Sequence, residues 1–139
     1  MSNQVAKENM KKLEYFPKDV RQSMNENLPG DLTIAKVASL CEGRPFKIYM
    51  IINNQMNSAD LEELNLSVRA FHCLKRAEYN TVGDLVNGID GQNDLLKLRN
   101  CGKNSAIEIM AKLFVYQYSV LPKGQQGWYM NKILEVNGI

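Results

Sequence analysis

The residues of this protein whose types and spacing could do chemistry gather in one stretch, Leu98 to Met110, which reads LRNCGKNSAIEIM. Gly102 and Lys103 stand just before a run with helical spacing, which Ser105 opens with Glu108 in a capping-box pattern. The first N–H groups of a helix have no partner within it, and with the helix dipole they attract an anion such as a phosphate. Glycine would allow a sharp turn and a close approach of that anion, while lysine adds charge. The stretch predicts a helix-hairpin-helix turn that holds DNA by its backbone. An ordinary helix connection with Lys103 in solvent is the alternative.

Short, closely spaced helices are predicted to position this stretch. Ser67 can cap a helix that runs to about Ala77, and Thr81 with Asp84 can cap a short helix over VGDLV. Another short piece follows at NDLLKL, and a longer helix begins at Ser105. The residues expected to face the core at helical spacing are Val68, Phe71, Cys73 and Leu74 in the first helix, and Ala106, Ile109, Met110, Leu113, Phe114 and the polar Gln117 in the last.

The organisation of the sequence changes near residue 58. Before it, Asp31 could cap a helix that carries the apolar residues from Leu32 to Cys41. Phe46–Ile52 is rich in strand formers, but no second convincing strand is available to pair with it, so we favour a helix there. Asn53–Ser58 is polar and turn-prone, which is typical of a linker. We therefore expect an all-α protein with a mostly helical extension of unknown role at residues 1–57 and a compact helical domain with a C-terminal tail at residues 58–139.

Composition excludes several classes of function. The 17 Lys and Arg residues against 15 Asp and Glu give a net charge of only +2, so a nucleic-acid surface would have to be a local patch. No apolar run is long enough to span a bilayer and no secretion signal is evident, which predicts a cytoplasmic protein. The cysteines Cys41, Cys73 and Cys101 form no metal-binding pattern. His72 is the one histidine, and no serine or cysteine nucleophile has an identifiable base partner. We expect no enzymatic activity and no metal or cofactor.

The segments LEELNLSVRAFHCLKRAEYNTVGDLV and LLKLRNCGKNSAIEIMAKL resemble the C-terminal domain of the bacterial RNA polymerase alpha subunit. The resemblance covers about residues 60–121 and places two linked motifs in the family's order and spacing. It implies a compact helix-hairpin-helix-type fold that binds double-stranded DNA through the minor groove of A·T-rich sites and through phosphates. Gly102 and Ser105 match phosphate-contacting positions of the family, and Lys103 matches a basic position.

The resemblance also implies roles for individual residues. Arg69 stands where an arginine enters the minor groove, while His72 replaces an asparagine and Asn104 replaces a lysine that contact DNA in the family. Cys73 matches a family cysteine, which we expect mainly to pack and also to offer a backbone-side contact. The predicted DNA-binding residues are Arg69, His72, Cys73, Lys75, Gly102, Lys103, Asn104 and Ser105.

Acidic residues before the first motif suggest a second use of the surface. Glu63 matches a position that meets the sigma factor, with Glu62 beside it, although Asn65 stands where another acid is usual; an acidic first helical turn is the plainer interpretation. Residues 60 to 118 include seven basic and eight acidic residues, which gives a net charge of minus one. DNA binding would therefore need clustering of the cations Arg69, Lys75, Arg76, Arg99 and Lys103.

The alternative function is a protein-interaction module that engages RNA polymerase, sigma or a transcription regulator with little DNA binding. A helix-hairpin-helix accessory to a repair or recombination enzyme is a third. Trp128 and Tyr129 in the tail could anchor such a partner, or they could fold back over the small core.

Overall fold

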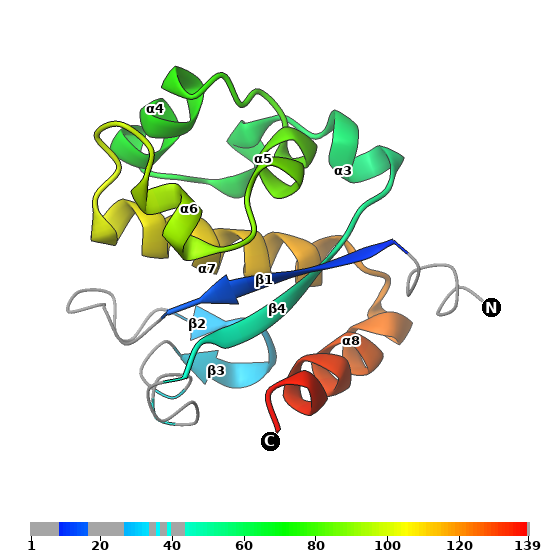
Figure 1. Ribbon diagram of the computed structural model, residues 1–139. Coiled ribbons are helices and arrows are strands. Elements are labelled where there is room, and N and C mark those ends of the chain that lie inside the picture. Colours follow the sequence, from blue (N-terminus) through cyan, green and yellow to red (C-terminus); the bar gives the residue numbers. More distant parts are fainter. Residues whose placement is uncertain (1–8, 17–26, 34–35, 37–38, 40–43, 139) are drawn as a thin grey trace.

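Helix α7 passes through the middle of the molecule, with a two-stranded ribbon in front of it and shorter helices around it (Figure 1). The computed structural model describes residues 9–16, 27–33, 36, 39 and 44–138. The strands are β1 (Met10–Tyr15), β2 (Asn27–Leu28), β3 (Leu32–Thr33) and β4 (Phe46–Ile51). The helices are α3 (Asn54–Ser58), α4 (Val68–Arg76), α5 (Val82–Gly88), α6 (Gln92–Leu96), α7 (Lys103–Val120) and α8 (Lys123–Val136), with 3-10 turns η2 (Pro29–Asp31) and η3 (Leu61–Leu64).

Helix α7 is buried on more than one side because it is apolar over much of its circumference. It packs against η3, α4 and α6 and also against β4. Its Phe114 ring lies 5.9 Å from that of Phe46 on β4 and 6.3 Å from that of Tyr129 on α8, measured between ring centroids. One hydrophobic cluster therefore joins the ribbon, α7 and α8.

The ribbon corrects the expectation of an all-α fold. Phe46–Ile51, predicted as helix, is strand β4, and it pairs antiparallel with β1 from Met10 opposite Ile51 to Tyr15 opposite Phe46. Phe46, Ile48 and Met50 are fully buried, so the strand-forming side chains cover α7. The partner strand MKKLEY was missed because its charged residues hide the two buried positions Leu13 and Tyr15. The predominance of helix is confirmed.

Side chains from α7 and from the residue after α8 satisfy the outer edge of β4. The backbone N–H of Ile51 donates to Oε1 of Gln117 at 2.6 Å. Asn137 accepts from the Lys47 N–H at 2.8 Å and donates back to the Lys47 carbonyl at 2.9 Å. These bonds occupy backbone groups that an edge strand would otherwise offer to another protein. Gln117, the polar member of the predicted core face, is buried for this reason.

The C-terminal tail folds back over the core as helix α8. Tyr129 is fully buried, and its hydroxyl donates to the Tyr49 carbonyl at 2.6 Å. Burial raises the pKa of Tyr129 well above its usual value, so the hydroxyl keeps the proton that it donates. Trp128 is half-buried against the same cluster. Of the two roles considered for this aromatic pair, covering the core is confirmed for Tyr129.

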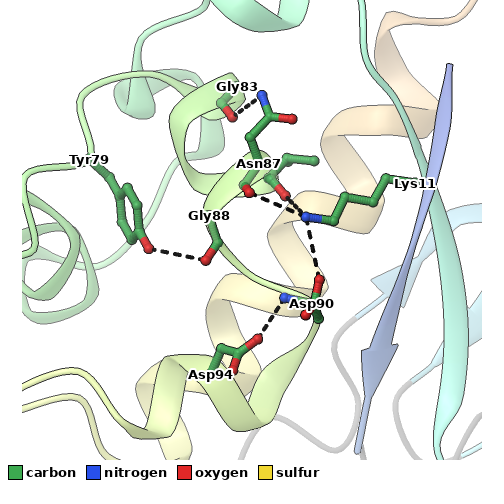
Figure 2. Close-up of polar contacts among 8 residues, drawn as sticks. Lys11, Tyr79, Gly83, Asn87, Gly88, Asp90 and Asp94 are labelled. Atoms are coloured by element: carbon green, nitrogen blue, oxygen red, sulfur yellow. Dashed lines mark hydrogen bonds and ion pairs between the residues drawn. The ribbon is translucent and has the colours of Figure 1, made fainter.

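Lys11 ties β1 to the end of helix α5 (Figure 2). Its Nζ donates to the carbonyl of Val86 at 2.9 Å and to that of Asn87 at 3.4 Å, and it lies 3.6 Å from the Asp90 carboxylate. A cation is favourable there because the last carbonyls of a helix lack partners and carry the negative end of its dipole. The N–H of Glu14 also donates to the Asp90 carbonyl at 3.2 Å.

The structure differs from two other expectations for the N-terminal half. Leu32 and Thr33 form strand β3, where the start of a helix was predicted, and most of that predicted helix lies outside the described residues. The supposed linker is helix α3, capped by Asn53, with Met56 in the core. The division of the sequence near residue 58 stays a prediction, although the hydrophobic cluster includes residues from both sides of it.

The caps of the two short helices are confirmed. The Ser67 hydroxyl accepts from the N–H of Ala70 at 3.3 Å at the start of α4. Thr81 and Asp84 form a reciprocal capping box at the start of α5. Backbone N–H groups of Asn80 and Thr81 lower the pKa of Asp84, because they stabilise its charged form. Val68, predicted to face inward, is instead 73% exposed at the start of α4.

Gly91 offers a test of the packing between the ribbon and the helices. A Cβ at Gly91 would lie 2.7 Å from the Glu14 carbonyl oxygen and 2.9 Å from its nitrogen, both backbone atoms that cannot move aside cheaply. We expect Gly91→Ala to lower the free energy of unfolding by about 1–3 kcal/mol through overpacking. Denaturant titration followed by circular dichroism measures the change.

Gly102→Ala is the matched control, because a Cβ at Gly102 meets nothing within 4 Å. This variant should lose less than about 1 kcal/mol, the range of an exposed helix-cap change. Equal stability of the two variants would contradict the close approach of Gly91 to β1.

Candidate nucleic-acid interface

An open hollow of about 1110 Å³ lies between helix α4 and the turn that precedes α7. Cys101 and Leu98 contribute apolar surface to its lining. Every predicted DNA-binding residue except Lys75 lines it. These residues are Arg69, His72, Cys73, Gly102, Lys103, Asn104 and Ser105.

Helix α4 presents one stripe of side chains to the hollow. Arg69, His72, Cys73 and Arg76 follow the i, i+3, i+4, i+7 spacing that places residues on one helix face. Arg69, His72 and Arg76 are exposed, whereas Cys73 is buried. The Cys73 thiol donates to the carbonyl of Asn100 at 2.9 Å, which joins α4 to the turn before α7.

The turn before α7 is sharp at Asn100 and not at Gly102. Asn100 has a φ of 63°, in the left-handed region that asparagine tolerates. Gly102 has a φ of −84° and a ψ of −178°, which any residue can adopt, so the expectation that glycine is needed for the turn is wrong. What Gly102 does supply is the absence of a side chain beside the hollow.

The N-terminus of α7 has no side-chain cap. The expected capping box of Ser105 and Glu108 is wrong, because the helix begins at Lys103 with Gly102 in the cap position. The N–H groups of this first turn, some of them on residues that line the hollow, have no acceptor within the helix. This is the arrangement that helix N-termini use to bind anions.

Glu108 positions helix α4 beside the hollow, a role that the local sequence pattern did not indicate. Its carboxylate accepts from the Ser67 N–H at 2.5 Å and from the Ser67 hydroxyl at 2.8 Å. Ser67 in turn caps the helix that carries Arg69. Glu108 therefore fixes the start of α4 relative to α7, and no spacing rule within one helix could have identified a partner 41 residues away.

All charged side chains among the described residues that line the hollow are positive. Arg69, Arg76 and Lys103 are its charged residues, and the described residues that line it include no carboxylate. The clustering of cations that DNA binding requires is thus present for three of the five candidates. Arg99 does not line the hollow, and neither does Lys75.

Lys75 points into a different, smaller hollow. Its Nζ donates to Oδ1 of Asn80 at 2.7 Å and lies 5.9 Å from the centre of the Phe71 ring. Asp60 and Glu62 line the same hollow, so Lys75 shares it with two acidic residues. The structure does not bring Lys75 to the other predicted DNA-binding residues.

The acidic pair proposed for partner binding lies away from the hollow of Arg69. Glu62 and Glu63 are both exposed on η3. The pKa of Tyr116 is raised, chiefly by burial and then by the charge of Glu63. Glu63 therefore lies near Tyr116 of α7, and neither Glu62 nor Glu63 lines the hollow of Arg69.

The two described cysteines are packing groups. Burial, followed by the nearby Cys73, raises the pKa of Cys101 to about 12, so the thiol stays protonated at neutral pH. Within the described ranges no cluster of His, Cys, Asp and Glu could hold a metal ion. No helix in the described part of the protein is both long and apolar enough to cross a bilayer.

Residues 52–114 match the family model of the C-terminal domain of the bacterial RNA polymerase alpha subunit. The resemblance predicted from the sequence is confirmed over this segment. It contains α3 to α6, the hollow and the first two-thirds of α7, whereas β1 to β4 and α8 lie outside it.

Similar relatives include the subunits alpha of DNA-directed RNA polymerase from three bacteria. That of Synechococcus sp. (strain JA-3-3Ab) is 49% identical over 61 residues, which are 44% of this protein and 18% of the relative. That of Gloeobacter violaceus is 44% identical over 70 residues, 50% of this protein and 22% of the relative. That of Heliobacterium modesticaldum is 53% identical over 53 residues, 38% and 16% respectively. The match thus spans about a fifth of the length of these relatives. No solved structure matches the protein.

The link between α7 and α4 can be tested at Glu108. Glu108→Ala removes both hydrogen bonds to Ser67, and we expect the free energy of unfolding to fall by about 1–2 kcal/mol. Urea titration gives this value, and amide hydrogen exchange should show faster opening at the start of α4.

Glu135→Ala on α8 is the control. Glu135 pairs with Lys132 at 3.5 Å on the surface, and such a pair contributes little. If Glu108→Ala were no more destabilised than Glu135→Ala, the carboxylate would not hold α4 in place.

Proposed function

We propose that this protein is a non-catalytic, transcription-related DNA-binding protein that contacts the phosphates and the minor groove of A·T-rich duplex DNA. The observation that carries the proposal is the hollow itself. It combines an uncapped helix N-terminus with three cations and no carboxylate among the described residues that line it, in a segment whose overall charge is negative. The match of this segment to a family of polymerase domains supports the transcription setting.

The turn before α7 is the proposed phosphate site. Gly102 lets a phosphate approach the backbone, the free N–H groups of Lys103 and Asn104 donate to it, and the lysine ammonium adds charge. Ser105 lines the wall of the hollow but is only 6% exposed, so its hydroxyl has a secondary role. These contacts position the duplex and carry no sequence information.

Helix α4 is the proposed groove-reading element. Arg69 lies at the start of the helix, where the Glu108–Ser67 link holds the backbone, and its side chain is exposed beside the hollow. Arginine is attracted to the narrow minor groove of A·T-rich DNA because the negative potential is strongest there. His72 lies nearly one turn further along the same face, with its ring edge-on to Phe71 at 5.8 Å, and can donate to a groove acceptor.

Substitutions in the two halves of the hollow should have different effects. Arg69→Ala should weaken binding to A·T-rich duplex by about 1–3 kcal/mol and reduce the preference over G·C-rich duplex. Lys103→Ala should weaken binding to both duplexes alike and lower the slope of log K against log salt by about one unit. Electrophoretic retardation on both duplexes at two salt concentrations measures these quantities.

Both side chains are exposed, so circular dichroism should show both variants folded like the parent. Parent-like binding by folded Arg69→Ala would overturn the minor-groove assignment. Loss of binding that is equal on both duplexes for both variants would leave phosphate contact as the whole of the interaction.

A protein-interaction module that engages RNA polymerase, sigma or a transcription regulator is the second candidate. The observation that favours it is the exposed acidic pair Glu62 and Glu63, which lies outside the cationic hollow and could meet basic side chains of a partner. His72 and Asn104 favour it too, because the resemblance implies other DNA-contacting residues at these positions. Failure of the parent to bind either duplex at low salt would favour this candidate.

The double change His72→Asn with Asn104→Lys separates the two candidates. Both residues are exposed at the hollow, so stability should change by less than about 0.5 kcal/mol. The amide should restore a groove contact and the lysine one phosphate contact, which together should strengthen binding by about 1–3 kcal/mol. Titration of A·T-rich duplex at matched salt compares the parent with the double variant.

A parent that binds tightly and a double variant that binds equally or less well would show that His72 and Asn104 make a DNA contact of their own. If neither protein bound at low salt, the hollow would not be a DNA site, and the acidic pair would be the place to seek a partner.

A further inference from the structure

Arg76 is the charged residue of the hollow to which neither the local motifs nor the resemblance gave a role. It ends helix α4, seven residues after Arg69 and on the same face, so the two Cα atoms are about 10 Å apart along the helix axis. The stripe on α4 therefore begins and ends with a guanidinium, and the turn with Lys103 lies across the hollow.

The guanidinium of Arg76 is exposed and available. Among the described residues no hydrogen bond or ion pair engages it. The ammonium of the neighbouring Lys75, in contrast, donates to Asn80 and lies over the Phe71 ring. Acidic residues line the same hollow as Lys75. A helix rotates by about 100° per residue, which is why adjacent cations face different surfaces.

We propose that Arg76 is a phosphate-contacting residue of the DNA site and that it supplies the charge for which Lys75 was the candidate. This inference rests on the proposed function. A guanidinium presents a planar fork of donors that matches phosphate oxygens, whereas a lysine engages phosphate as a point charge. Arg69 and Arg76 then hold the duplex at the two ends of α4, and the N-terminus of α7 holds it from the other wall.

A plainer role for Arg76 is a favourable charge near the C-terminus of α4. Lys75 lies in the same last turn and would serve the helix dipole equally well. The pair Arg76→Ala and Lys75→Ala therefore separates the two roles, because both variants lose one charge from the same helix end and only Arg76 lines the cationic hollow.

The experiment titrates the protein of residues 1–139 against A·T-rich and G·C-rich duplexes over a range of salt concentrations. We expect Arg76→Ala to weaken binding about three- to tenfold on both duplexes and to lower the salt slope by about 0.9. Arg76→Lys should keep the slope of the parent and lose part of the affinity, because it keeps the charge and loses the fork. Lys75→Ala should bind within about twofold of the parent, since the salt-dependent term comes from phosphate contacts and Lys75 faces another surface.

The outcomes distinguish this inference from the proposed function. If the parent binds DNA and Arg69→Ala is impaired, but Arg76→Ala binds with the affinity and slope of the parent, only the role of Arg76 is overturned. An equal loss in Lys75→Ala and Arg76→Ala would also overturn it, because a charge effect without contact would explain both. If the parent binds neither duplex, the proposed function fails and the role of Arg76 fails with it.

Discussion

The burial of helix α7 on several sides is the constraint on which the rest of the structure depends. Phe114 packs between Phe46 of the ribbon and Tyr129 of α8, while other faces of the helix meet η3, α4 and α6. A helix held in this way cannot shift or rotate without opening the core. The first turn of α7 is therefore held in place at one wall of the cationic hollow. Glu108 holds the start of α4 against α7 through its two hydrogen bonds to Ser67.

Electrostatics shows why tertiary structure matters for this surface. The segment from residue 60 to residue 118 carries one more negative than positive charge, which argues against a polyanion partner when the residues are only counted. In the folded protein these charges lie on different faces of the helices. Arg69, Arg76 and Lys103 share one hollow, whose described lining holds no carboxylate, whereas Lys75 joins Asp60 and Glu62. Local fields, and not the sum, determine which surface attracts an anion.

The β1–β4 ribbon and α8 make this protein more than the segment that matches the polymerase family. The ribbon is attached to the helical part through Lys11 at the end of α5 and through the close approach of Glu14 to Gly91. Gln117 and Asn137 occupy backbone groups at the outer edge of β4. A ribbon of two strands is marginal alone, so its order comes from α7 and α8, which cover it and satisfy that edge.

The sequence by itself determined the short helices from Ser67 to Leu96, because caps and turn signals act over a few residues. It was enough, too, to indicate the resemblance to a polymerase domain, whose family model matches residues 52–114. It also predicted which residues approach one another at the hollow, with Lys75 as the exception. Only the tertiary structure decided that Phe46–Ile51 is a strand, since its conformation depends on pairing with a segment more than thirty residues earlier. The partner of Glu108 was decided in the same way. Helical spacing alone places Lys75 and Arg76 on different sides of α4, but the tertiary structure decided which side borders the cationic hollow. Such choices depend on which groups meet in space, and local sequence patterns do not carry that information.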